Sequence, residues 1–166
     1  MPIPLLSFAM KIFSAVLLSA LFCLPAQAES LSPDLPIHDA ARTGSGQAVQ
    51  SLLAADAKMR DARTALGSQP LHLAAMNPDL SAMQALLRAG ANPNARDNEG
   101  ATPLHMAAYA SRPQHARLLL EAGADPLAKT DNGRDATAMA RKVKSDETAG
   151  IISLWILKAC KAGKPC

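Results

Sequence analysis

The chain has 166 residues, the size of a single domain, and only 3% of them are aromatic. Ala and Leu dominate its apolar residues; both are strong helix formers, whereas a β-sandwich or barrel needs more Val, Ile, Phe and Tyr. Residues 1–28 contain one of the 17 Lys and Arg and no acid, so 16 basic and 14 acidic residues remain beyond them. That near-neutral balance gives no sign of nucleic-acid binding, and the composition predicts a helical domain.

The first 28 residues have the pattern of an export signal. Lys11 is their only charge, and an almost unbroken apolar run follows over residues 12–24. A proline and the small-x-small triplet Ala26-Gln27-Ala28 come directly after that run. A positive start, a short apolar core and an A-x-A site are typical of a secretory signal peptide. We therefore predict cleavage between Ala28 and Glu29.

Three alternatives for this segment remain open. A membrane anchor needs about 20 apolar residues, so residues 3–24 would serve as one only if the membrane tolerated Lys11. Cys23 is a second alternative, as a lipid-attachment site, but Phe22 before it is bulkier than the small residue that such a site has. A start at Met10 would place Lys11 at the beginning of a shorter signal.

Two stretches of the chain recur 33 positions later. Residues 69–75 read Gln-Pro-Leu-His-Leu-Ala-Ala, and residues 102–108 read Thr-Pro-Leu-His-Met-Ala-Ala. Residues 86–93 recur in the same phase at 119–126, each time with Leu-Leu, a charged residue and then Ala-Gly-Ala. A fixed period of this length indicates a repeat architecture.

Two degenerate copies flank the complete ones. The first begins at 36–41 with Pro-Ile-His-Asp-Ala-Ala, and the last, at 133–140, has lost the Pro, Leu and His of the motif. A stacked array needs atypical repeats at its ends, because the terminal faces have no neighbour to cover them. The order of the copies therefore fits a short array with two complete repeats at its centre.

The 33-residue unit with its T-P-L-H-x-A segment resembles the ankyrin repeat. The resemblance covers residues 36 to about 157 and implies an all-α solenoid of about four helix-turn-helix units with short β-hairpin turns. We accordingly divide the chain into a signal peptide (1–28), a linker (29–35), an ankyrin-repeat domain (36–158) and a C-terminal tail (159–166). Within the domain, we expect repeats at about 36–68, 69–101 and 102–134 and a cap at 135–158.

Local signals agree with this unit. Pro70 and Pro103 suit the first turn of a helix, where no backbone N–H is needed. Gly67, Gly100 and Gly133 mark the same turn in three successive copies. The spacing thus predicts a helix that begins after each of these turns.

The histidines invite a metal interpretation, which the spacing does not favour. His38, His72 and His105 recur with the repeat, and successive repeats lie too far apart for one ion to be held at about 2.0–2.1 Å. The resemblance implies instead that this His forms local hydrogen bonds that order the turn. His115 falls on a second helix, where we expect it to be solvated.

An unusually apolar segment over residues 151–157 ends the domain. We expect it to form the second helix of the cap, with Trp155 closing the open end of the stack. An exposed patch that binds a partner is the alternative, since large apolar patches mark interaction sites.

Cys160 and Cys166 are the cysteines that remain once Cys23 is removed with the signal. An even count in an exported chain supports a disulfide between them, which would close a small loop and stabilise the tail modestly. Free or intermolecular thiols remain the alternative, because pairing cannot be deduced from spacing.

The resemblance also implies a concave binding surface, built from the turn tips and the exposed faces of the first helices. The matching positions are Arg42, Arg63, Leu66, Met76, Asn77, Arg96, Asn98, Glu99, Tyr109, Lys129 and Asp131. Three of the cations are spaced 33 residues apart, which predicts a basic stripe, and Tyr109, Met76 and Leu66 interleave with it as anchors. A stripe that is generic to the family is the other interpretation.

No nucleophile arrangement, phosphate-binding glycine loop or H-E-x-x-H segment occurs, so we predict neither enzyme activity nor a cofactor or metal. We predict a monomeric, non-catalytic module that binds a protein partner in the periplasm, with no nucleic acid and no membrane contact after cleavage. Two alternatives remain open: an inhibitor or immunity-type protein that blocks one enzyme, and a membrane-tethered scaffold if the signal is retained.

Overall fold

The computed structural model describes residues 34–162, so the predicted signal peptide and Cys166 lie outside the described residues. Within that range the chain forms eight α-helices and one 3-10 helix. In chain order these are α1 (Pro36–Thr43), α2 (Gly46–Ala55), η1 (Ala57–Asp61), α3 (Pro70–Ala74), α4 (Leu80–Arg88), α5 (Pro103–Tyr109), α6 (Pro113–Glu121), α7 (Ala136–Lys142) and α8 (Asp146–Leu157). Over 34–162, no helix is long and apolar enough to span a bilayer.

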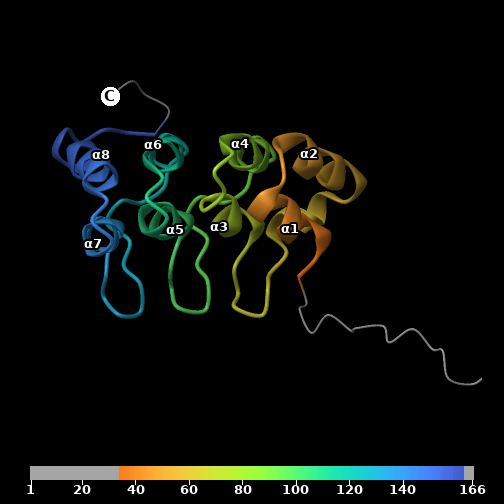
Figure 1. Cartoon of the computed structure of the whole chain (residues 1–166), viewed down its shortest axis with the longest axis horizontal. Helices are drawn as coiled ribbons and strands as arrows, with labels where there is room; N and C mark the ends of the chain where they lie inside the picture. Colours follow the sequence, from red (N-terminus) through yellow and green to blue (C-terminus); the bar gives the residue numbers. More distant parts are fainter. Residues whose placement is uncertain (1–33, 163–166) are drawn as a thin grey trace, which may run out of the picture. The chain divides into compact units, whose positions relative to one another are not determined.

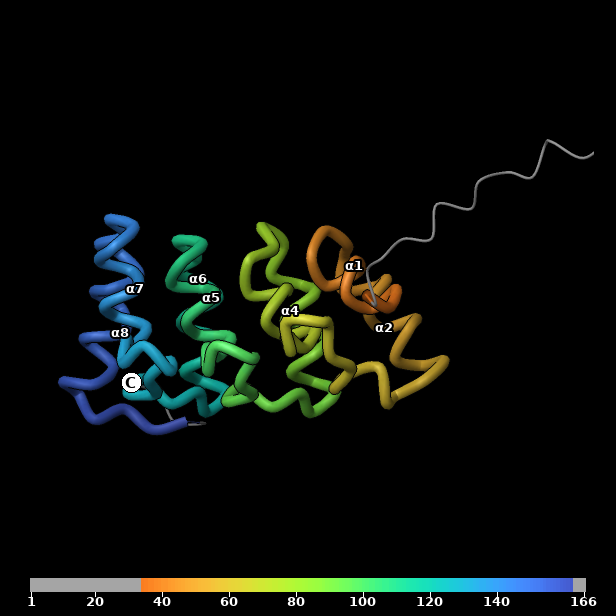
Figure 2. The backbone as a smooth tube through the Cα atoms, turned by 90° about the horizontal axis from the view of Figure 1, so that it is seen from below, coloured from red at the N-terminus to blue at the C-terminus, as the bar shows by residue number. Residues whose placement is uncertain are grey.

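The helices form two layers. The first helices of the pairs, α1, α3, α5 and α7, lie in one row, and α2, α4, α6 and α8 lie in a second row (Figure 1). The pairs follow one another side by side along the array (Figure 2), and each helix contacts its counterpart in the next pair. The predicted all-α repeat solenoid is therefore confirmed.

Stacking supplies the core of the array. Leu71 and Leu104 are equivalent positions in successive repeats, and both are fully buried, as are Leu86 and Leu119 in the second layer. All four belong to one hydrophobic cluster that runs through successive repeats, so truncating one to Ala would cost about 2–5 kcal/mol. No single helix pair could bury these residues alone.

The expected β-hairpins do not form. The described residues contain no β-strand, and their one isolated bridge joins Lys129 to Asp135. Each long turn is closed by two backbone bonds, which in the first turn run from Thr64 N to Ser68 O and from Gly67 N to Thr64 O. Both bonds lie within the turn and extend no strand pairing, and backbone groups at the tip bond the adjacent turn instead, from Asn98 N to Leu66 O.

The repeated histidines join each helix start to the following turn. The Nδ1 atom of His72 accepts the backbone N–H of Gln69 at 3.1 Å, and its Nε2 lies 3.2 Å from Ala101 O. His105 repeats this arrangement with Thr102 N and Arg134 O at 3.2 and 3.1 Å. Because Nδ1 accepts and a carbonyl can only accept, each ring is neutral with its proton on Nε2. The predicted turn-ordering role of this His is confirmed.

The expectation for His115 is wrong. Its side chain is 3% exposed, because it shares a helix face with the buried Leu119 four residues later. Within the described part of the chain, its Nε2 atom has no hydrogen-bond partner. Burial, and secondarily the nearby Arg112 charge, lower the pKa of His115 below its usual value. Burial likewise lowers the pKa of His72 and of His105.

These lowered pKa values predict acid sensitivity. The unfolded chain takes up protons on His near pH 6.5, whereas the folded chain keeps the buried rings neutral, so stability is present above that pH and falls as the pH drops through it. Replacing His115→Leu should reduce the loss in unfolding free energy between pH 7.5 and pH 5. Urea denaturation at the two pH values measures it.

Gln114→Leu is the matched control, since Gln114 is exposed on the same helix. This control should keep the full pH dependence of the unmodified chain. Equal pH dependence in the two variants would contradict the role given to His115.

Candidate protein-binding surface

The long turns over residues 62–69, 95–102 and 128–135 are bonded to one another at their tips. The backbone N–H of Asn98 donates to Leu66 O at 3.0 Å, and that of Asp131 donates to Glu99 O at the same distance. The two bonds occupy equivalent positions in successive repeats. The tips therefore form one continuous edge along the array.

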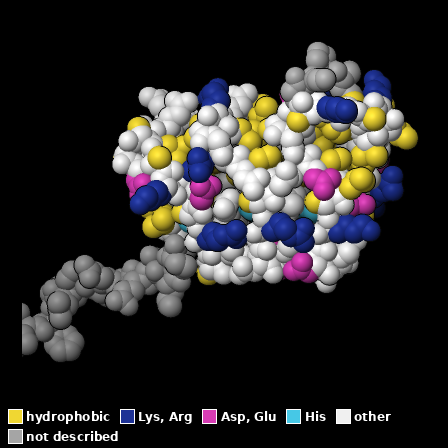
Figure 3. Space-filling view, turned by 180° about the vertical axis from the view of Figure 1, so that it is seen from behind, with side chains coloured by type: hydrophobic (Ala, Val, Ile, Leu, Met, Phe, Trp, Pro, Cys, Tyr) yellow, Lys and Arg dark blue, Asp and Glu magenta, His cyan; other side chains and the backbone are white. Residues whose placement is uncertain are grey.

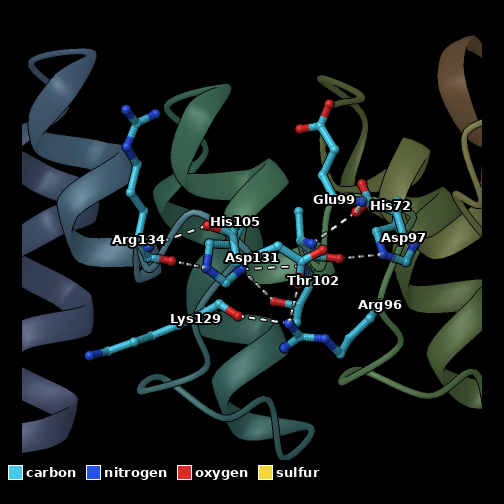
Figure 4. Close-up of polar contacts among 11 residues, drawn as sticks. His72, Arg96, Asp97, Glu99, Thr102, His105, Lys129, Asp131 and Arg134 are labelled. Atoms are coloured by element: carbon cyan, nitrogen blue, oxygen red, sulfur yellow. Dashed lines mark hydrogen bonds and ion pairs between the residues drawn. The ribbon is translucent and has the colours of Figure 1, made fainter.

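Side chains reinforce this edge. Arg63 donates through Nη1 to Gly67 O at 2.8 Å in its own turn and to Arg96 O at 2.9 Å in the next. Arg96 repeats the step one turn later, with its Nη2 atom 2.9 Å from Lys129 O and 3.4 Å from Asp131 Oδ1 (Figure 4). We call this set of bonds between neighbouring turns the turn ladder.

The basic residues do lie in a row, as predicted, but some of them hold neighbouring turns together. A row of Lys and Arg side chains crosses one face of the array (Figure 3). The guanidinium groups of Arg63 and Arg96 donate hydrogen bonds to backbone carbonyls of the turn ladder. Within residues 34–162 no further long turn follows that of Lys129, and its ammonium group forms no ion pair there. Lys129 is therefore the stripe residue best placed to contact another molecule.

Two predicted anchors are exposed. Leu66 is 74% exposed at a turn tip, and Tyr109 is 58% exposed at the last residue of α5. Met76 is half-buried and packs against the core. Asn98 and Glu99 are exposed at their turn, but the Asn98 side chain also donates to Ala65 O at 3.1 Å.

The prediction for Asn77 is wrong. Its side chain is 2% exposed and donates to Ala41 O and Gly44 O, both at 3.0 Å, while its Oδ1 accepts Asp79 N. The end of α1 leaves backbone carbonyls without helical partners, and this amide satisfies them from the next repeat. Asn77 therefore joins repeats and cannot contact a partner.

Arg42 lies apart from the turn ladder. Its Nη2 atom is 2.8 Å from Asp34 Oδ2, and its Nη1 is 3.8 Å from Asp39 Oδ1. The charge of this predicted contact residue is therefore already compensated within the chain. Cys160 is among the described residues and Cys166 is not, so their pairing stays a prediction.

An exposed apolar surface lies at the C-terminal end, where the sequence left a partner-binding patch open as the alternative to a buried cap. Leu127, Leu154 and Leu157 are 62%, 51% and 80% exposed. The apolar content of residues 151–157 signalled either a buried cap or a patch. Trp155 is half-buried against the core, so the end is only partly closed.

The described residues contain no group of three or more His, Cys, Asp or Glu able to hold a metal ion. Both ring nitrogens of His72 and of His105 already have hydrogen-bond partners. The arrangement is therefore suited to contact with another macromolecule through exposed side chains on a fixed edge.

The chain matches the family model described as ankyrin repeats, in three copies, over residues 37–130. It therefore belongs to the ankyrin-repeat family. Ankyrin repeats are generally protein–protein interaction modules and typically non-catalytic. Among curated proteins, no sequence gives a significant match to this chain.

The turn ladder predicts different costs for two equivalent glycines. Gly100 and Gly133 both have positive φ values, 72° and 74°. A Cβ atom at Gly100 would meet Asp131 Oδ1 and Arg96 Nη2, whereas one at Gly133 would meet nothing within 4 Å. We expect Gly133→Ala to cost about 1–2 kcal/mol from its φ alone, and Gly100→Ala about 1 kcal/mol more through lost ladder bonds.

Thermal and urea denaturation of the two variants would measure this difference. Gly133→Ala serves as the control for backbone strain. Equal losses at the two positions would mean that the turn ladder contributes nothing to stability.

Proposed function

We propose that this chain is an exported, non-catalytic module that binds a folded protein through its turn tips and the exposed residues of its first helices. The observation that carries this proposal is the turn ladder, which holds exposed Leu66 and the Lys129 cation on one fixed edge. The family supports the general role of protein binding, and the fixed edge supports the turn tips as the proposed site.

Preorganisation makes this edge suitable for binding. Ordering of loops is one of the main free-energy costs of association. Here the bonds between turns order the loops before a partner binds. The exposed Leu66 and Tyr109 can then enter pockets on a partner, and apolar or aromatic anchors of this kind dominate interface energies. Affinity therefore rests on a few exposed side chains.

The charge of the edge indicates the chemistry of the partner. Arg63 and Arg96 remain cationic while they bond carbonyls, and Lys129 adds an ammonium group with no ion pair among the described residues. A partner surface that carries carboxylates beside apolar side chains would complement this row. The proposed partner is accordingly a protein with an acidic ridge.

The first test is capture of a partner from an extract of the native cell. Leu66→Ala combined with Lys129→Ala should weaken capture about tenfold or more, because one anchor and one cation are lost. Tyr109→Ala alone should weaken it in the same direction. Arg63 and Arg96 are left unchanged, since their substitution would also loosen the turn ladder.

The matched control is Leu127→Ala with Arg88→Ala, which removes one exposed Leu and one exposed cation from other surfaces. It should capture as the unmodified chain does, and all variants should keep helical circular dichroism. Capture that is equally strong in the Leu66 and Lys129 variant would exclude the turn edge as the site. A captured enzyme whose activity falls on mixing would specify an inhibitor.

Export to the periplasm is the second part of the proposal. The apolar run over 12–24 and the triplet Ala26-Gln27-Ala28 support it. Mass spectrometry of the protein isolated from its native cell should find Glu29 as the first residue. An intact 1–28 segment would instead support the membrane-tethered scaffold.

A further inference from the structure

Helix α8 is buried on only one side. It packs against α6 and α7 through Thr148, Ala149 and Ile152. The opposite side presents residues at helical spacing, which are Glu147, Gly150, Leu154 and Leu157. All four are exposed.

This outer side is apolar where an end face is expected to be polar. Leu154 and Leu157 are 51% and 80% exposed, and Figure 3 shows hydrophobic side chains at this end of the array. Leu154 also borders a groove of about 270 Å³ that Ile151 and Trp155 line from the same helix. Terminal repeats of stacked arrays normally carry a polar outer face for solubility. This end therefore has the character of a contact surface.

Gly150 adds an independent observation. It lies inside α8, where glycine lowers helix stability relative to alanine. A Cβ atom added there would meet nothing within 4 Å, and its φ is not in the left-handed region. Nothing in the described chain thus requires a glycine at this exposed position. Gly150 lies on the exposed face one turn before the exposed Leu154, so the missing side chain leaves a gap that a large side chain from outside can fill.

The charges at the two ends of α8 are opposite, so the helix complements a second copy of itself that runs antiparallel to it. Asp146 and Glu147 lie in the first turn, and Lys158 and Lys161 follow the last one. Over residues 34–162 none of these four forms an ion pair. The ends also suit the helix macrodipole, but an apolar centre between opposite ends is self-complementary as well.

We propose that a second copy of this chain docks on this face, with the two α8 helices antiparallel about a two-fold axis. Glu147 then lies beside Lys158 of the second copy, and Leu154 fills the gap over its Gly150. A two-fold contact repeats each of these pairs, so every favourable interaction counts twice. An unrelated partner would not explain why the same helix carries both members of each pair, Glu147 with Lys158 and Leu154 with Gly150.

The dimer is a weak one. A helix of 12 residues is about 18 Å long, so a single helix pair buries less than the roughly 800 Å² per partner of a stable interface. Dimerisation therefore depends on concentration in the micromolar range or above. The monomer expected from the sequence is the form present in dilute solution.

Sedimentation velocity of the purified protein over a range of concentrations, under reducing conditions, tests the proposal. Leu154→Gln with Leu157→Gln should raise the dimer dissociation constant about tenfold or more. Leu66→Gln, which alters an equally exposed Leu at a turn tip, is the control and should leave the constant unchanged. A monomer at every concentration, or a dimer that the α8 variant leaves intact, would overturn the proposal.

Two further variants identify the antiparallel arrangement. Glu147→Lys and Lys158→Glu should each weaken the dimer about fivefold, and the double exchange should restore it. Gly150→Gln should weaken the dimer while raising the melting temperature of the monomer, because it fills the gap but favours the helix. A charge exchange that fails to restore the dimer, or a Gly150 variant that dimerises normally, would rule out this packing.

Discussion

Each repeat depends on its neighbour for two different things. The apolar sides of Leu71 and Leu104 need a facing helix pair, and the buried carbonyl of the following turn needs a donor. His72 supplies that donor from the start of a helix while its other nitrogen caps the same helix. One neutral ring thus fixes the next turn relative to the helix before it. With the turns in register, Arg63 can reach Arg96 O, and the edge proposed for binding follows from that alignment.

The array could be predicted because each structural repeat produces one copy of the 33-residue sequence pattern. Pro70 and Pro103 mark helix starts 33 residues apart, and α3 and α5 begin at those residues. The predictions that proved wrong concern contacts between neighbouring repeats, and the repeat pattern alone does not show which side chains make those contacts. Asn77 is buried because the end of α1 in the preceding repeat leaves carbonyls to be bonded, and His115 is buried because its helix face meets a neighbour. Likewise, the turns do not form hairpins because backbone groups at their tips form hydrogen bonds with the neighbouring turn.

The basic row shows why equivalent positions need not have equivalent roles. Three cations at the same place in successive turns would repel one another if they were equally exposed and unpaired. In the structure, Arg63 and Arg96 direct their guanidinium groups at carbonyl oxygens of the next turn, and Asp131 lies near Arg96. The last position holds Lys129, beyond which the described part of the chain has no further long turn to bond. Sequence alone could place the row, but only the order of the turns distinguishes its structural members from Lys129.

The two ends of the array differ in a way that bears on both proposals. At the first end, Arg42 pairs with Asp34 and Asp39, and Leu35 beside them is 43% exposed. At the other end, Leu154 and Leu157 are left exposed. Helix α8 belongs to the layer farther from the turns (Figure 1), so a second copy held there leaves the turn edges of both copies accessible. Such a dimer would present two binding edges, and a partner with two sites would gain by effective concentration without any new contact.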